Sequence, residues 1–217
     1  MGWSINHQKM HNSDLKSFFF GVVGRLLYLA NHFEEKCSFV LKVAKLEEHI
    51  EENGSLPVSD ELVGLLKDKM LGKTIIEMGE IPSFTKDDID ALDKARKARN
   101  LIAHEGAAIG YPITTVRSKL VLDQLTKLRE AMTDLIEGDN LVSGWVYEIT
   151  EKDYPPQDLI ADYPQRVAGW VFSGVDLDQL KQMDFTDDDP LTWAQFAKMM
   201  EGRTRARSRS HSEANEE

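Results

Sequence analysis

The sequence has little of what a disulfide-bonded or membrane-spanning protein requires. Cys37 is the single cysteine among 217 residues, so an intramolecular disulfide is impossible. The most apolar stretch, FFFGVVGRLLYLA at 18–30, is interrupted by Arg25 and falls short of the roughly 18 uninterrupted apolar residues that a spanning helix needs. A charged leader with a small-residue cleavage site is also missing. We therefore expect a cytoplasmic protein that does not associate with membranes.

Positive charge is outnumbered by negative charge. The chain has 26 lysines and arginines against 37 aspartates and glutamates, a net charge of −11, so RNA binding would need a local cationic site. The one dense basic run is RTRARSRS at 203–210, in a segment rich in Arg, Ser and Glu that has too few apolar residues to form a core. We expect residues 202–217 to be a disordered tail and residues 1–12 to be a flexible N-terminus.

Helical periodicity is abundant. From Ser13 to about Glu52, apolar residues recur at steps of three and four, which predicts one long amphipathic helix. Gly138 is expected to end or bend the last of the helices predicted for this part of the chain. Because no alternating strand pattern competes, residues 13–138 are predicted to form an all-α, antiparallel four-helix bundle. The three further helices are expected from Ser59 to Gly79, from a cap at Thr85 to Gly106, and from Thr114 or Thr115 to Glu137.

The remainder, 139–201, is predicted to be a helical extension packed on the bundle. LVSGWVYEITEK at 141–152 favours a continuation of the preceding helix, although its β-branched and aromatic residues leave a short strand possible. Tyr154-Pro155-Pro156 interrupts the chain. Short helices are then expected at 165–172 and 192–200.

One motif stands out in the third predicted helix. ARNLIAHEGA at 98–107 places Arg99, Asn100 and His104 close together near the helix end. Residues four apart are neighbours on a helix, so Asn100 can orient the ring of His104. Arg99 lies five positions before His104, about 140° round the helix, so the two side chains do not converge by helix geometry alone. Either Arg99 reaches around the helix, or a second copy supplies its partner.

RNLIAH fits the R-N-x-x-x-H form of the Arg-x(4–6)-His motif of the HEPN superfamily, and a long first helix with the motif at the end of the third is similar to that bundle. In the endoribonucleases of this family, the residues matching Arg99 and His104 form a composite site across a homodimer, without a metal. The resemblance implies a HEPN-like fold and cleavage of RNA by attack of the ribose 2′-hydroxyl on the adjacent phosphate, leaving a 2′,3′-cyclic phosphate. A toxin–antitoxin or phage-defence role, with an antitoxin or regulatory protein as partner, would fit such an enzyme.

This chemistry assigns a role to each residue of the motif. His104 would exchange protons near neutral pH. Arg99 would bind phosphate oxygens as negative charge develops, and Asn100 would hold the imidazole in place. Arg96 and Lys97 would bind flanking phosphates as the local cationic site.

No cofactor or metal ion is expected. His7 and His11 lie four apart in HQKMH, but the glutamate of the zinc-protease pattern is missing and no third ligand is indicated. DFTDDDP at 184–190 lacks the glycine and terminal glutamate of a calcium loop and is interpreted as a turn and helix cap.

Two other interpretations of the motif remain open. KARKARNLIAHEG at 94–106 also resembles the corresponding helix of mannitol-repressor-like proteins, which implies a non-catalytic helical regulator or binding module. Alternatively, His104 interacts with the carbonyls and dipole at the helix C-terminus while Arg99 pairs with a surface carboxylate.

Overall fold

The computed structural model describes residues 14–108 and 118–178, and every regular element in these two ranges is a helix, as expected. No helix in this part of the chain combines the length and apolar character needed to cross a membrane. The described helices are α1 (Asp14–Asn53), α2 (Ser59–Leu65), α3 (Leu71–Met78), α4 (Lys86–Ala108), α5 (Ser118–Glu151) and α6 (Gln157–Val171).

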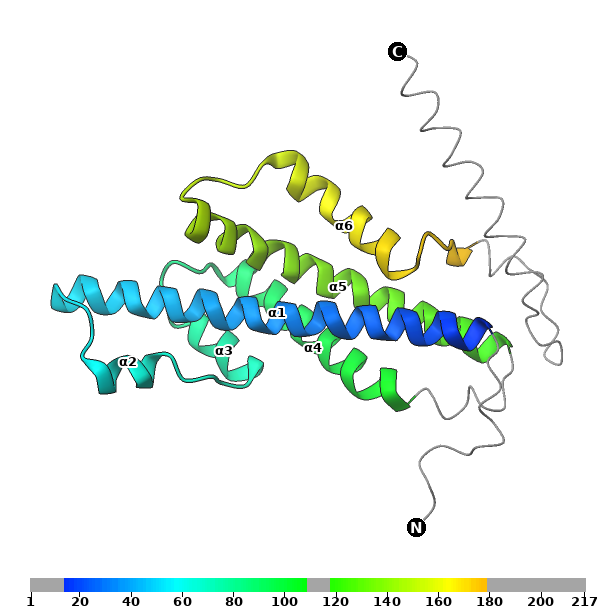
Figure 1. The fold of residues 1–217 in the computed structure, drawn as a ribbon, viewed down its shortest axis with the longest axis horizontal. Coiled ribbons are helices and arrows are strands. Elements are labelled where there is room, and N and C mark those ends of the chain that lie inside the picture. Colours follow the sequence, from blue (N-terminus) through cyan, green and yellow to red (C-terminus); the bar gives the residue numbers. More distant parts are fainter. Residues whose placement is uncertain (1–13, 109–117, 179–217) are drawn as a thin grey trace, which may run out of the picture.

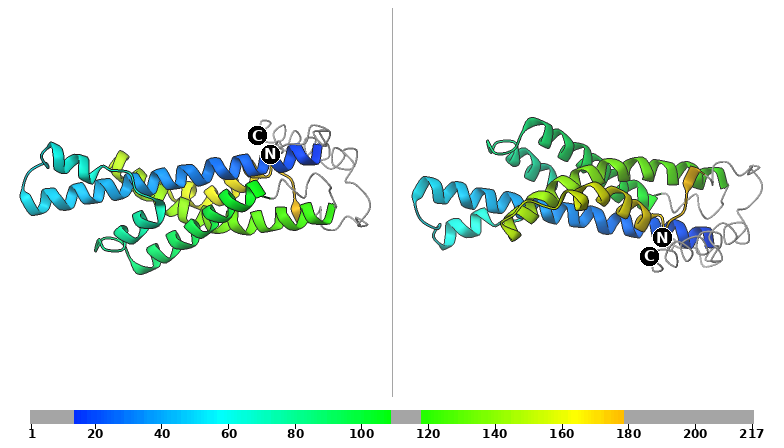
Figure 2. Two further views of the ribbon diagram at one scale, coloured as in Figure 1. Left: turned by 90° about the horizontal axis from the view of Figure 1, so that it is seen from below. Right: turned by 90° about the horizontal axis from the view of Figure 1, so that it is seen from above.

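Three long helices, α1, α4 and α5, lie along the length of the molecule (Figure 1). α1 and α5 run in the same direction and α4 runs against both, an arrangement that the views from above and below also show (Figure 2). The shorter α3 packs on α1 and α4, while α6 packs on α5 and α1. In the described residues, the four helices expected from the sequence correspond to the three long helices α1, α4 and α5 and to one region that holds the two shorter helices α2 and α3.

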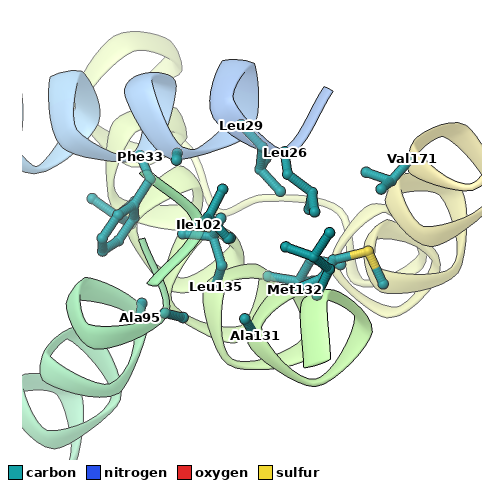
Figure 3. Close-up of a cluster of buried hydrophobic side chains, with 14 of the residues drawn as sticks. Leu26, Leu29, Phe33, Ala95, Ile102, Ala131, Met132, Leu135 and Val171 are labelled. Atoms are coloured by element: carbon teal, nitrogen blue, oxygen red, sulfur yellow. The ribbon is translucent and has the colours of Figure 1, made fainter. Parts of the chain in front are cut away.

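The core lies where the three long helices meet. Leu26 and Phe33 of α1, Ile102 of α4 and Leu135 of α5 are completely buried and point toward one another (Figure 3). These residues belong to the three- and four-step apolar pattern of their helices, so burial of one face accounts for helix formation. At about 25 cal/mol per Å² of apolar surface removed from water, this shared core supplies the main favourable contribution to folding.

Gly138 lies within α5, so of the two roles expected for it, an end or a bend of the helix, the first is wrong. A Cβ atom added at Gly138 would overlap the Cβ of Ala95 on α4. Two residues without bulky side chains therefore allow α4 and α5 to approach closely. α5 continues to Glu151, which confirms the favoured helix over 141–152. The expected boundary between a bundle ending at 138 and an extension starting at 139 falls inside this one helix.

The single helix expected from Ser59 to Gly79 is instead two short helices, α2 and α3, and that expectation was wrong. Met70 has an extended backbone, with φ −63° and ψ 141°. Lys69 just before it donates to both carboxylate oxygens of Glu77, at 2.7 and 2.6 Å. In a continuous helix these two residues would be about 12 Å apart along the axis, so the ion pair favours the break. Asp68 adds a bond to Lys42 of α1 at 2.5 Å.

α6 begins at Gln157, earlier than the helix expected at 165–172, and includes Pro164. Proline has no N–H to donate to the carbonyl four residues before it, here that of Ile160. The side chain of Asn140 on α5 donates to this carbonyl instead, at 3.1 Å. The hydrogen bond that proline removes from α6 is therefore replaced by one from the neighbouring helix.

Several expectations fall outside the described residues. These are the flexible N-terminus at 1–12 with His7 and His11, the turn at 184–190, the helix at 192–200, and the tail at 202–217 with its basic run.

Candidate functional site

α4 carries the motif on its flank. Its start is fixed as the sequence predicts, because the hydroxyl of Thr85 accepts from the backbone N–H of Asp88 at 3.2 Å while the Asp88 carboxylate accepts from the Thr85 backbone at 2.9 Å. Ala95, Ala98 and Ile102 then face the core and are buried. Arg99 lies beside this buried face, within reach of α1.

Arg99 is bound to α1. Its Nη2 lies 2.6 Å from Oε2 of Glu34, and its Nη1 donates to Oδ1 of Asn100 at 3.3 Å. The side chains of Arg99 and Glu34 are 24% and 31% exposed, so the pair is screened less than a fully exposed one. The Nε of Arg99 is buried and has no acceptor among the described residues. The guanidinium is thus oriented, and its buried Nε–H is unused.

His104 lies apart from this pair. Its side chain is exposed and forms no hydrogen bond or ion pair with the residues that the structure describes. The Oδ1 of Asn100, expected to orient His104, faces Arg99 instead. Within one chain the motif therefore brings Arg99 and Asn100 together and leaves His104 open to solvent one turn before the end of α4.

Arg96 and Lys97 share one counter-ion. Nη2 of Arg96 lies 2.7 Å from Oδ1 of Asp93, and Nζ of Lys97 lies 2.8 Å from Oδ2. The hydrogen bonds from Lys97 and Arg96 hold the pKa of Asp93 below its ordinary value. Two cations and one anion leave a net charge of +1, so the expected cationic site is weaker than the two residues alone suggest.

Sequence reasoning missed Glu34, and no local signal marks it. It lies between the buried core residues Phe33 and Cys37, in a helix rich in charged residues, and only the packing of α1 against α4 selects it as the partner of Arg99. The sequence analysis predicted only that Arg99 could pair with some surface carboxylate, as part of the non-catalytic interpretation, and did not say which one.

A second polar cluster was also missed. Asp139 of α5 is completely buried, and Nζ of Lys36 lies 2.9 and 3.0 Å from its two carboxylate oxygens. Lys36 also donates to Oγ of Ser143 at 2.8 Å, and the hydroxyl of Tyr163 on α6 donates to Asp139. Burial and the charge of Asp139 raise the pKa of Tyr163 above its ordinary value. These four residues join α1, α5 and α6.

No family model, curated protein or solved structure matches this chain. Its candidate site therefore rests on its own geometry. Among residues 14–108 and 118–178, no group of three or more metal-binding side chains is placed to hold an ion. What the site offers is an oriented guanidinium, an amide in contact with it, and a separate accessible imidazole.

This set of groups is suited to reactions of phosphates. Arginine stays charged at any physiological pH and presents several donors to phosphate oxygens. Histidine can both accept and donate a proton near pH 7. Any anion that binds Arg99 must either compete with Glu34 or use the donors that Glu34 leaves free.

Proposed function

We propose that this protein is a metal-independent endoribonuclease of the HEPN type, which cleaves RNA through attack of the 2′-hydroxyl and leaves a 2′,3′-cyclic phosphate. The observation that carries the proposal is the contact of Arg99 with Asn100 near the end of α4, with His104 exposed on the next turn of the same helix. An all-helical chain that begins its described part with a long helix agrees with such a fold.

The proposed site is composite. Arg99 and His104 point about 140° apart on α4, so a phosphate bound by one guanidinium does not reach the imidazole of the same chain. A homodimer with a two-fold axis near the ends of both α4 helices would bring Arg99 of one protomer to His104 of the other. His104 would transfer the proton, and Arg99 would stabilise the developing charge.

Asn100 then has a different role from the one expected from the sequence. Its contact with Nη1 of Arg99 makes it a positioning residue for the guanidinium. Arg96 and Lys97 would bind the flanking phosphates, with their charge partly offset by Asp93. The enzyme would act in the cytoplasm, in a toxin–antitoxin or phage-defence system in which an antitoxin or regulator controls it.

One observation favours a second function, that of a non-catalytic helical regulator or binding module. Arg99 is already paired with Glu34 at 2.6 Å, as a purely structural arginine would be. In that case the exposed His104 of α4 would contact a protein or nucleic-acid partner without changing it.

Incubation of the purified chain with total RNA in excess EDTA distinguishes the two functions. The nuclease is expected to cut RNA to products with 2′,3′-cyclic phosphate ends. His104→Ala and Arg99→Ala should each lower the rate about 100-fold or more, because general acid–base catalysis alone contributes on the order of 10²–10⁴-fold. His49→Ala and Arg129→Ala, which alter the same residue types elsewhere, should keep the wild-type rate. Intact RNA, or full activity in both motif variants, would disprove the proposal that this protein is a nuclease acting through Arg99 and His104.

A further inference from the structure

A groove of about 290 Å³ lies between α1 and α6, two helices that contact each other. Four ring side chains line it, together with Lys36 and two aliphatic residues. The rings are those of Tyr28 and His32 on α1 and of Tyr163 and Trp170 on α6.

The outer rings form an exposed platform. Tyr28 is in edge contact with His32, with centroids 4.3 Å apart, and with Trp170, with centroids 5.9 Å apart. Tyr28 and Trp170 are 59% and 48% exposed, far more than rings that serve only to pack a core. Edge contacts at 64° and 67° leave ring faces open for a further planar group to stack on.

The polar groups of the groove indicate what that planar group is. The hydroxyl of Tyr28 and the indole N–H of Trp170 have no hydrogen-bond partner among the described residues, so both can bond the edge of a planar polar ring. Lys36, in contrast, uses its donors on Asp139 and Ser143. The groove therefore selects for stacking and edge bonding more than for charge.

Cations lie beside the platform. Nε of Arg25 donates to the carbonyl of Val171, the residue after Trp170, at 2.8 Å, and Arg25 has no ion pair within the described part of the chain. Arg166 is one turn before Trp170 and is 68% exposed. Its Nη2 is 3.5 Å from Oδ2 of Asp162, a long and exposed ion pair, so an anion can displace Asp162 from Arg166. In a chain of net charge −11, aromatic rings flanked by arginines are a local site for a base carrying a phosphate.

We propose that the α1–α6 groove binds an unpaired base of single-stranded RNA, stacked on Tyr28 and Trp170, with Arg25 at the adjacent phosphate. This inference rests on RNA being the substrate of the proposed nuclease. On α1, His32 and Glu34 are about 160° apart, so the groove lies on a different side of the helix from Arg99. The groove thus contributes affinity for single strands and does not take part in the cleavage step.

The test is binding of a short unstructured RNA oligonucleotide that carries one 2-aminopurine, measured in the His104→Ala chain so that cleavage does not interfere. Stacking on the rings should quench the 2-aminopurine fluorescence. Trp170→Ala and Tyr28→Ala should each weaken binding about 10-fold, whereas Trp170→Phe should retain most of it. Tyr154→Ala, which removes an exposed ring outside the groove, is the matched control and should bind normally. Circular dichroism verifies that each variant is folded.

The outcomes separate this inference from the proposed function. If Trp170→Ala and Tyr28→Ala both bind like the parent, or if the parent binds no oligonucleotide, the groove does not hold a base, whatever the cleavage assay gives. Tighter binding of duplex than of single-stranded RNA would overturn it as well. If the wild-type chain binds through the groove but leaves RNA intact in EDTA, the nuclease fails and the base site stands.

Discussion

The guanidinium of Arg99 on α4 is held by the carboxylate of Glu34 on α1, 65 positions earlier in the chain, with Nη2 and Oε2 2.6 Å apart. The orientation of the motif's arginine is thus set by a second helix. Because α1 is 40 residues long and contributes much of the core, its position relative to α4 is fixed by packing along its length.

Replacement of Glu34 measures what this pair does in the proposed enzyme. Glu34→Ala should lower the RNA cleavage rate about 10-fold or more, because a hydrogen bond to a charged group contributes about 1.5–3 kcal/mol to the orientation of its partner. Glu34→Gln keeps an oxygen acceptor and should retain most of the rate. A higher rate in Glu34→Ala would contradict this and identify Glu34 as a competitor for the phosphate site.

Mixing the Arg99→Ala and His104→Ala chains tests whether the site is shared between protomers. A hybrid dimer has one composite site that lacks both groups and one that keeps both. Because half of the dimers in an equal mixture are hybrids after full exchange, activity should rise from near zero toward about a quarter of the wild-type value. Light scattering should give a dimer mass at micromolar concentration. A strictly monomeric chain, or no recovery after proven exchange, would rule out the composite site.

Lys36 and the completely buried Asp139 should show strong coupling in stability. Asp139→Leu should lower the free energy of unfolding by about 3 kcal/mol or more, because it leaves the ammonium of Lys36 without its buried partner. Lys36→Met should cost a similar amount for the converse reason. The double variant should recover most of the loss, as followed by urea denaturation. Additive losses in the double variant would show that the two charges do not depend on each other.

Tyr163 should make stability decrease at alkaline pH. Burial and the charge of Asp139 raise its pKa in the folded state above the ordinary value of 10.0. Below pH 10 the hydroxyl is protonated whether the chain is folded or not, and its stabilising effect is fully present. Above pH 10 only the unfolded chain loses the proton, so unfolding becomes easier by up to about 1.4 kcal/mol per pH unit. In urea titrations from pH 8 to 11, Tyr163→Phe should lose this part of the slope, and Tyr154→Phe should keep it.

Two helical glycines should respond to alanine in opposite ways. Gly138→Ala should destabilise by about 1–3 kcal/mol, since the new Cβ meets Ala95 and α4 must move. Gly24→Ala meets nothing within 4 Å and should stabilise by up to about 1 kcal/mol through helix propensity. Thermal melting of the two variants measures the contrast. Equal and stabilising effects would show that α4 and α5 are not in close contact at Gly138.

Patterns repeated along a helix could be read from the sequence. The apolar steps of α1, the Thr85 cap of α4 and the continuation of α5 past residue 141 were all predicted, because each depends on residues close in sequence. The break between α2 and α3 was not, because it depends on ion pairs that Lys69 and Asp68 form with residues of other elements.

In the candidate site, too, features within one helix could be predicted from the sequence, and contacts between helices could not. The spacing of Arg99, Asn100 and His104 on one helix follows from helix geometry, including the divergence of Arg99 from His104. The hydrogen-bond partner of Arg99 on another helix could not be predicted in this way, because Glu34 becomes the neighbour of Arg99 only when α1 packs on α4. The packing role of Gly138 could not be predicted for the same reason, since its closeness to Ala95 is a property of two helices together.

The hydrogen bond that Asn140 supplies in place of the one lost at Pro164 links the formation of α6 to the formation of the α1–α6 groove. The carbonyl of Ile160 obtains its hydrogen bond from α5 and not from within α6, so α6 lacks one of its own bonds whenever it separates from the bundle. A segment of 15 residues with such a gap is a poor helix in isolation. Helix formation and docking in this segment are therefore one coupled event. The side of the groove that carries Trp170 therefore exists only when α6 is folded and packed against α1. A partner that prevents α6 from docking would remove the groove without binding in it.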